Sequence, residues 1–510
     1  MENKIVKSNI VGKCVSIVSA YIIAIFIAVT TGGAWANDVS ISFTQEHLLW
    51  WMLSFTIVAT IVLFVVNYKK DISLNDFVKK KILLFIICCV TYFCEFKGDF
   101  KSFFSFFFLT ILWFLIFLHQ IDDYKLVWRA LVNVVVIYAL ISLIFYFFGT
   151  CIHLIPDSGR TSVVWGTWTE SIRTFHNIYY ESQFLNLNDI ILIPRNCGIY
   201  PEGPMYNFVL CMALASELFI SKKVHYWKCI VLIITIITTF STTGYLFLII
   251  ATIFYIANII FSKKENSIHK LAFLLLAFLG VLIMLGILIQ KLETPSGAGS
   301  VDVRSDHLIA CFKAWLEAPI NGVGFDNLEA VLNYAQFKQG MSMGIAYLIA
   351  CGGILLSSLL VVPYIINGIS VLKRKKYEEL IFETLFLFLY FFTAVTIYPI
   401  LRFFIAYIII FSYQDKPIEN RTDRLKEKIC FILEETDYSV SVYIQKLKTK
   451  KKYILLGSIG LGVAIGLVFG SSGRGASITT ILYSILAFFA GGIMVALWTY
   501  FQLIWIENKK

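Results

Sequence analysis

The feature that most constrains this chain is a series of about fourteen apolar stretches spread over its 510 residues. Hydrophobic residues make up 58% of the sequence, and the mean hydropathy is +0.78. A soluble domain has too little interior to cover that much apolar surface, whereas a lipid bilayer covers it directly. We therefore expect an all-α polytopic membrane protein with about 14 transmembrane helices.

The expected spans and their orientation follow from the apolar stretches and the loops between them. About three-quarters of the 43 Lys and Arg residues fall on one side, which the positive-inside rule assigns to the cytoplasm together with both termini. We divide 228–241 from 244–261 at the polar, breaker-like segment Ser241–Gly244. The spans are 10–30, 47–67, 82–94, 102–119, 129–150, 199–220, 228–241, 244–261, 270–290, 343–369, 379–397, 401–413, 453–470 and 478–506.

The N-terminal segment is basic and then apolar, as in a signal peptide with a cleavage site at Ala34-Trp35-Ala36. The many spans that follow favour an uncleaved first helix. The net charge of +10 is explained by loop residues that set topology and touch lipid headgroups, so we expect membrane lipids and no nucleic acid as partners. Cys151 and Cys197 could pair across one outer loop, but unlinked thiols are the favoured interpretation.

The chain divides into a transmembrane core, residues 1–413, a basic amphipathic linker on the cytoplasmic side, 414–452, and a transmembrane hairpin, 453–510. Glycines four residues apart in the hairpin could contact a partner such as a chain-length regulator, or could simply pack on the core. The core has two long extracytoplasmic loops, 151–198 and 291–342. The first is aromatic and is expected at the membrane face.

Arg195 and Glu202 lie where the first outer loop returns to the membrane. Gly198, with the prolines and glycine of 201–204, prevents a regular helix there. Irregular backbone at membrane depth is tolerated where it is buried in protein or lines a wet cavity, so this entry is a candidate polar site. The alternative is an Arg–Glu pair that only stabilises the entry.

Arg304 and His307 lie in the second outer loop, three residues apart and therefore on one helical face. We expect a flexible segment at 294–299, then a helix over about 301–318 with Arg304 near its anion-favouring N-terminus. Guanidinium groups bind phosphate oxygens bidentately, so Arg195 and Arg304 form a plausible diphosphate clamp. His307 could transfer a proton or be an ordinary interfacial residue.

Three further residues complete the candidate site. Arg402 follows a Tyr-Pro turn on the outer side and is either a third anion contact or a membrane anchor. Gly322 and Gly324 are expected to form a tight backbone turn after the helix. There is no phosphate-binding glycine loop, no ligand cluster of His or Cys and no Asp-rich inner loop, so we expect no metal and no cofactor.

The run Arg195-Asn-Cys-Gly198-Ile-Tyr-Pro-Glu202-Gly-Pro-Met-Tyr-Asn resembles a segment of the O-antigen polymerase and ligase superfamily, the Wzy-type polymerases. The wording Glu-Gly-Pro-Met-Tyr-Asn is most similar to the capsular polysaccharide polymerases. The stretch from Arg304 through Pro319-Ile-Asn-Gly322-Val-Gly324 resembles the family's arginine, helix and glycine-turn segment. The resemblance covers roughly residues 190–400 by comparison with that family's motif order.

The resemblance implies a GT-C-like helical bundle in the bacterial cytoplasmic membrane. It implies an enzyme that joins undecaprenyl-diphosphate-linked oligosaccharide repeats on the outer face by metal-independent glycosyl transfer. Arg195 and Arg304 would hold the diphosphate, and Glu202 or His307 would orient or deprotonate the acceptor hydroxyl. The ligases carry a catalytic histidine downstream of their second arginine, and no histidine follows His307 here.

Two other classes remain open. A transporter or flippase for lipid-linked oligosaccharides should have charged residues deep within spans and matched broken helices in two halves. In this sequence the ionisable residues lie mainly at span ends, which favours an enzyme. A structural scaffold held by the C-terminal glycines would not need Arg195 or Arg304.

Overall fold

The structure is a computed structural model that describes residues 2–37, 43–66, 76–94, 98–119, 125–165, 168–186, 192–221, 223–261, 295–338, 340–374 and 377–411. All of these belong to one unit of the chain, Met1–Gln414. The expected span at 270–290, the linker 414–452 and the hairpin 453–510 lie outside the described residues.

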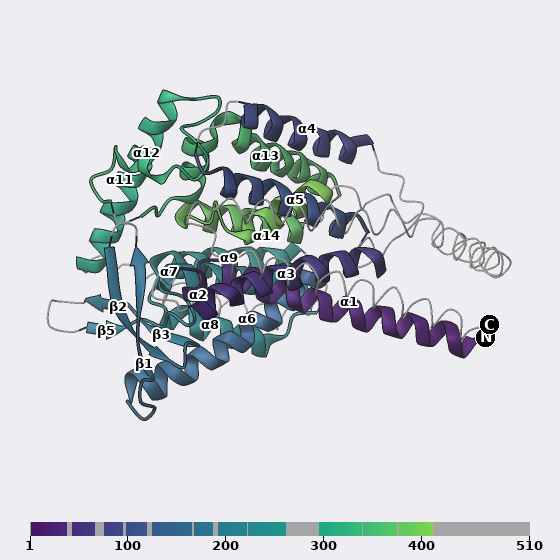
Figure 1. The fold of residues 1–510 in the computed structure, drawn as a ribbon. Helices are drawn as coiled ribbons and strands as arrows, with labels where there is room; N and C mark the ends of the chain where they lie inside the picture. Colours follow the sequence, from purple (N-terminus) through teal and green to yellow (C-terminus); the bar gives the residue numbers. More distant parts are fainter. Residues whose placement is uncertain are drawn as a thin grey trace. The chain divides into compact units, whose positions relative to one another are not determined.

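The described part is mostly helical, as expected (Figure 1). Apart from α11, which lies in the second outer loop, its longer helices overlap predicted spans, and two regions, Leu126–Cys151 and Gly344–Ile369, are long and apolar enough to cross a membrane. The helices are α1 (Glu2–Thr30), α2 (Ala34–Asn37), α3 (Phe43–Val66), α4 (Asp76–Cys94), α5 (Phe100–His119), α6 (Leu126–Ile144), the π-helix η1 (Phe145–Cys151), α7 (Gly203–Phe219), α8 (Tyr226–Thr238), α9 (Thr242–Phe261), α11 (Pro295–Glu317), α12 (Leu328–Leu332), α13 (Gly344–Arg374), α14 (Tyr377–Phe392) and α15 (Pro399–Phe411).

The first outer loop is not helical, which corrects the all-α expectation. It forms a three-stranded antiparallel sheet of β1 (Gly159–Trp165), β2 (Trp168–Phe175) and β3 (Tyr179–Glu181). A second, two-stranded sheet joins β4 (Phe184–Asn186) and β5 (Leu192–Pro194). The β-branched and aromatic residues of these segments suit a pleated surface. Several of the aromatic side chains are buried, among them Phe175 of β2 and Tyr179 and Tyr180 of β3.

Helix α11 begins earlier than predicted. The stretch 295–299, expected as flexible, is already helical from Pro295. Proline fits the first turn of a helix, where its missing N–H removes no hydrogen bond, and later glycines cost only about 1 kcal/mol each. Arg304 is therefore more than two turns into α11 and not near its N-terminus. The expectation that this helix end favours an anion at Arg304 is wrong.

The expected break between α8 and α9 and the expected glycine turn are both present, whereas the break in α13 was not predicted. The helices α8 and α9 are separate, and Phe240 between them has a positive φ of 49°. The turn after α11 inserts into a break in α13 at Gly353, whose φ is 56°. There, the N–H of Gly324 donates to the carbonyl of Cys351 (3.1 Å) and the N–H of Ile354 to that of Pro319 (3.0 Å). The turn thus replaces helix hydrogen bonds that the break removes.

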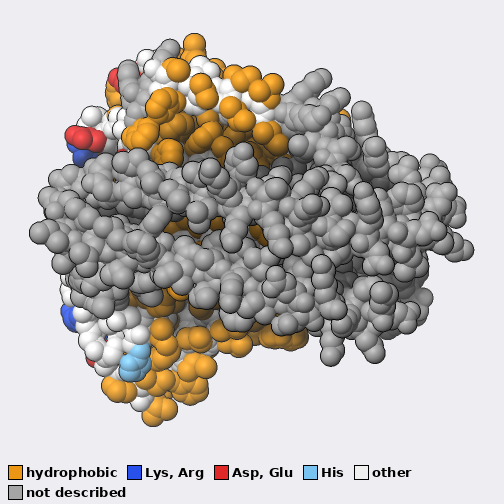
Figure 2. Space-filling view, turned by 45° about the vertical axis from the view of Figure 1, so that its right-hand side comes forward, with side chains coloured by type: hydrophobic (Ala, Val, Ile, Leu, Met, Phe, Trp, Pro, Cys, Tyr) orange, Lys and Arg blue, Asp and Glu red, His pale blue; other side chains and the backbone are white. Residues whose placement is uncertain are grey.

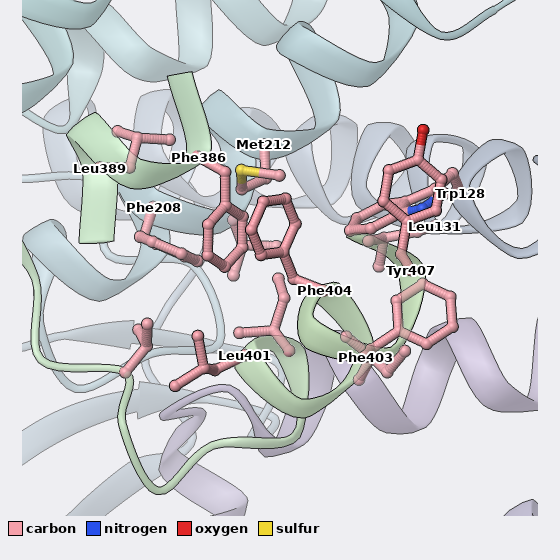
Figure 3. Packing of buried hydrophobic residues seen from close by; sticks show 14 of the residues in the cluster. Trp128, Leu131, Phe208, Met212, Phe386, Leu389, Leu401, Phe403, Phe404 and Tyr407 are labelled. Carbon is pink, nitrogen blue, oxygen red and sulfur yellow. The ribbon is translucent and has the colours of Figure 1, made fainter. Parts of the chain in front are cut away.

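The core lies where α6, α7, α14 and α15 meet (Figure 3). Phe386 of α14 stacks on Phe404 of α15 with ring centroids 3.6 Å apart. Trp128 of α6 packs against Phe403 at 4.9 Å, and both side chains are fully buried. Aromatic pairs of this kind add about 0.5–1.5 kcal/mol to the burial of their surface. This packing fixes α7, which carries the backbone of the candidate site at its N-terminus.

The helices have two ends that can be told apart by the contacts made there. At one end, which we call the strand end, the chain pairs at Ala34 with Ile199 (N···O 2.9 Å), and Gly98 forms a bridge to Phe325. The strands, α11 and α12 lie at this end (Figure 1). At the far end, Lys125 pairs with Glu379 at 3.3 Å.

Large apolar side chains remain exposed along the helices between these ends. Figure 2 shows hydrophobic side chains over much of the described surface in view, with charged ones gathered along one edge. A surface this apolar is typical of a face that meets lipid or another protein. Examples more than 50% exposed are Val18, Ile87, Ile137, Ile230 and Ile365, on α1, α4, α6, α8 and α13.

Candidate functional site

Arg195 is held in the irregular segment between β5 and α7. Its Nε donates to the carbonyl of Thr239 (2.8 Å), in the break between α8 and α9, and its Nη1 donates to Oε1 of Gln183 (2.9 Å). The next residue, Asn196, donates its backbone N–H to Thr238 (2.9 Å). The strands and the helix break therefore fix the guanidinium together. Three of its five N–H groups have no acceptor among the described residues.

Two glycines permit this arrangement. A Cβ on Gly203, the first residue of α7, would lie 2.8 Å from Nη2 of Arg195. Gly198 has a φ of +58°, and a Cβ there would lie 2.7 Å from the ring of Tyr206. The expectation that 198–204 cannot be a regular helix is confirmed up to Gly203, where α7 begins. Gly198 has the structural role that we predicted for it, since only glycine adopts this conformation readily.

Arg304 approaches the same place from α11. Its Nη1 donates to the carbonyl and to the hydroxyl of Ser300, one turn earlier. Its Nε is buried and has no hydrogen-bond partner among the described residues. Nη2 has no hydrogen-bond partner among the described residues either, so the donors of both Nε and Nη2 are unused there.

Arg195, Arg304 and Glu202 lie within electrostatic range of one another. Burial lowers the pKa of Arg304, the nearby charge of Arg195 lowers it further, and Glu202 raises it. Burial also lowers the pKa of Arg195, which Glu202 partly offsets. The charge of Glu202 therefore acts on two guanidinium groups that come from separate segments. Placing like charges together in a partly buried site is unfavourable unless an anion joins them.

Two buried polar atoms lie near the break between α8 and α9. The Nδ2 atom of Asn207 and the hydroxyl of Ser241 are buried, and neither has a hydrogen-bond partner among the described residues. A Cβ on Gly244 would collide with Asn207, so the α9 backbone approaches α7 closely here. Unsatisfied buried polar groups cost about 1–3 kcal/mol each. The N-terminus of α9 adds a further preference for negative charge.

His307 lies one turn beyond Arg304 but is occupied by the fold. It is only 2% exposed. Its Nε2 contacts the carbonyl of Phe337 (2.9 Å), and its Nδ1 contacts the hydroxyl of Ser342 (2.8 Å). Since a carbonyl only accepts, Nε2 carries the proton, and Nδ1 accepts from the serine. Both ring nitrogens are therefore used to tie α11 to the segment before α13.

Arg402 is placed apart from the two arginines of the site. It is 5% exposed, its Nη1 donates to the hydroxyl of Ser105 (2.8 Å), and its Nη2 donates to the carbonyl of Ile397. Asp326 is the charge that acts on it, and Phe106 packs against its guanidinium. Its burial contradicts a surface anchor that snorkels to water. No contact brings it to Arg195 or Arg304 in the part of the chain that the structure describes.

Gly322 and Gly324 serve the break in α13 and not the arginines directly. Both have positive φ, 74° and 124°, as the predicted tight turn requires. A Cβ on Gly322 would collide with the backbone of Cys351. The turn therefore anchors the C-terminal end of α11, the helix that carries Arg304, on α13.

The prediction that Cys151 and Cys197 are unlinked thiols is confirmed, because both cysteines are free.

Two residues of the site, Gln183 and Asn207, were not predicted from the sequence. Gln183 accepts from Arg195 and also from the backbone N–H of Gly203 (3.2 Å), so it joins the strand hairpin to the start of α7. It is a single glutamine in an aromatic segment, and the sequence gives no signal for it. Asn207 ends the motif quoted above, and its spacing of four from Gly203 places it one turn along α7. That spacing could have indicated it.

Comparison of the chain with known protein families, with curated proteins and with solved structures finds no match to any of them.

Proposed function

We propose that this chain is a bacterial polysaccharide polymerase of the Wzy type. It would join undecaprenyl-diphosphate-linked oligosaccharide repeats on the outer face of the cytoplasmic membrane, by metal-independent glycosyl transfer. The proposal includes a GT-C-like bundle of about 14 spans with the strand end outside. It is supported by the hydrogen bonds that hold the guanidinium of Arg195 and by the charge of Arg195, which acts on Arg304, because a lipid diphosphate would supply negative charge to both arginines.

Each residue has a role in the proposed reaction. Arg195 and Arg304 bind the diphosphate of the donor and stabilise the charge that grows as the bond between it and the anomeric carbon breaks. The acceptor hydroxyl attacks that carbon and loses its proton to Glu202. The leaving group departs as the lipid diphosphate. His307 is less suited to take the proton, since both of its nitrogens are bonded within the protein.

The test is the intermediate that accumulates in cells carrying Arg195→Ala or Arg304→Ala. Removal of one charge-stabilising donor should lower the rate about 10²–10³-fold. We expect lipid-linked single repeats to accumulate on the outer face, where an impermeant oxidant or glycosidase reaches them. Lys338→Ala, an exposed cation on the same loop, should leave polymer normal and serves as the control.

The same experiment separates the other classes. Repeats that accumulate on the inner face would indicate a transporter, and normal polymer in both arginine variants would contradict the proposal. A ligase would instead leave finished polymer on its lipid carrier. The absence of a histidine after His307 favours the polymerase over the ligase.

A further inference from the structure

A cavity of about 400 Å³ lies against the strands of the first outer loop. That size is within the usual range of small-molecule sites, which is about 300–1,000 Å³. Its walls come from the three-stranded sheet and from the β4–β5 hairpin. Among the residues that line it are Arg160, Glu170, Arg173, Glu181 and Phe184.

The hairpin joins this cavity to the arginine site. The cavity is lined by alternate residues of each hairpin segment, Ser182 and Phe184 on one and Leu192 and Pro194 on the other. In a strand, alternate residues face opposite sides. The residues between and beside them, Gln183 and Arg195, pair across the hairpin (N···O 2.9 Å) and bond through their side chains (2.9 Å). The cavity therefore lies on one face of the hairpin and Arg195 on the other.

Some of the charged side chains that line the cavity have hydrogen-bonding atoms without a partner among the described residues. Arg160, Arg173 and Glu181 lie side by side on β1, β2 and β3, in one row of the sheet. Arg173 pairs with Glu181 at 3.5 Å, and Arg160 has no ion pair among the described residues. The Oε2 atom of Glu181 is buried without a hydrogen-bond partner there. A ligand that donates to this carboxylate and accepts from a guanidinium would use both groups.

Sugar hydroxyls do both, since each is a donor and an acceptor. Phe184, 47% exposed at the wall, offers an apolar face to a sugar ring. We propose that this cavity binds a sugar ring of a saccharide chain, at a distance from the diphosphate held on the other face of the hairpin. Because a sheet layer is about 10 Å thick, only an oligosaccharide and not a single sugar could reach both places. The inference rests on the proposed function, for which it names a saccharide subsite.

The test measures binding of a saccharide that lacks the diphosphate. The probe is the reducing oligosaccharide released by mild acid from the lipid-linked material that accumulates in the Arg195→Ala strain. It is titrated against the full-length protein in nanodiscs. Glu181→Gln should weaken binding about tenfold, because it replaces a charged hydrogen-bond acceptor at nearly constant shape. Arg160→Ala, at an exposed position that does not threaten folding, should weaken it at least severalfold.

Two controls separate this inference from the proposed function. Glu329→Gln on α12, an exposed glutamate away from the cavity, should leave the Kd unchanged. Lys338→Ala, which is exposed and outside the cavity lining, should also bind the probe within about twofold of the parent. Parental affinity in both Glu181→Gln and Arg160→Ala would overturn the subsite and leave the polymerase standing. If the Arg195→Ala strain accumulates no lipid-linked oligosaccharide, both proposals fail.

Discussion

The two ends of the helices carry buried charge in different ways. At the strand end, the charge of Glu202 acts on both Arg195 and Arg304. At the far end, Lys81 of α4 donates to Oδ1 of Asn367 (2.9 Å) and lies within electrostatic range of Glu383. The pair Lys125–Glu379 lies beside them. In this far-end cluster two lysines face two glutamates, whereas at the candidate site the two arginines lie within electrostatic range of Glu202.

This difference separates a structural cluster from a ligand site. Hydrogen bonds from Lys81 to Asn367 and from Asn367 to Glu383 link α4, α13 and α14, although Oε2 of Glu383 is buried and has no hydrogen-bond partner among the described residues. A like-charged pair repels, so it stabilises the fold only when an anion is bound between its members. The charged residues of the far end are near helix ends and are matched, which does not resemble a transporter's path of charge through spans.

The largest expected effect is on stability at the far end. Lys81→Met removes the buried ammonium group that donates to Asn367 and lies within electrostatic range of Glu383, which is fully buried. We expect a loss of about 3–5 kcal/mol in the free energy of unfolding. Thermal unfolding of the detergent-solubilised protein measures it. The double variant Lys81→Met/Glu383→Leu should recover much of this loss, and an unchanged melting temperature in the single variant would mean that the cluster is not structural.

The next effect is on catalysis at the strand end, without loss of stability. Arg304→Lys keeps the charge but removes the Nε–Nη2 edge that is free in the structure. We expect the polymerisation rate to fall about 10–100-fold, since a lysine cannot bind two phosphate oxygens in the same way. The melting temperature without substrate should not fall. Polymer of normal amount and length in this variant would show that charge alone is sufficient.

The smallest effect concerns His307, which is on the same helix as Arg304 but has both ring nitrogens hydrogen-bonded within the protein. His307→Gln should lower stability by about 1–2 kcal/mol, because it weakens the bonds to Phe337 and Ser342. The dependence of the rate on pH should keep its shape. If the rate of the variant instead loses a pH-dependent limb near the pKa of a histidine, His307 takes part in proton transfer.

Sequence alone located the helices and the arginines but not how the arginines are held. Apolar periodicity and breakers such as Ser241–Gly244 predicted α8 and α9 because these signals act locally. The strands of the first outer loop were missed since their aromatic residues were attributed to the membrane face. The environments of His307 and Arg402 depend on residues 30 to 297 positions away, which no local pattern contains.

The most direct test of the convergence is a double-mutant cycle on binding of farnesyl diphosphate to the full-length protein in nanodiscs. The four proteins are the parent, Arg195→Ala, Arg304→Ala and the double variant. If both guanidinium groups hold one diphosphate, each single variant should weaken binding at least about tenfold. The double variant should depart from the sum of the two singles by more than about 0.5 kcal/mol. Additive losses within that margin would show that the two arginines act on separate groups and would contradict the account.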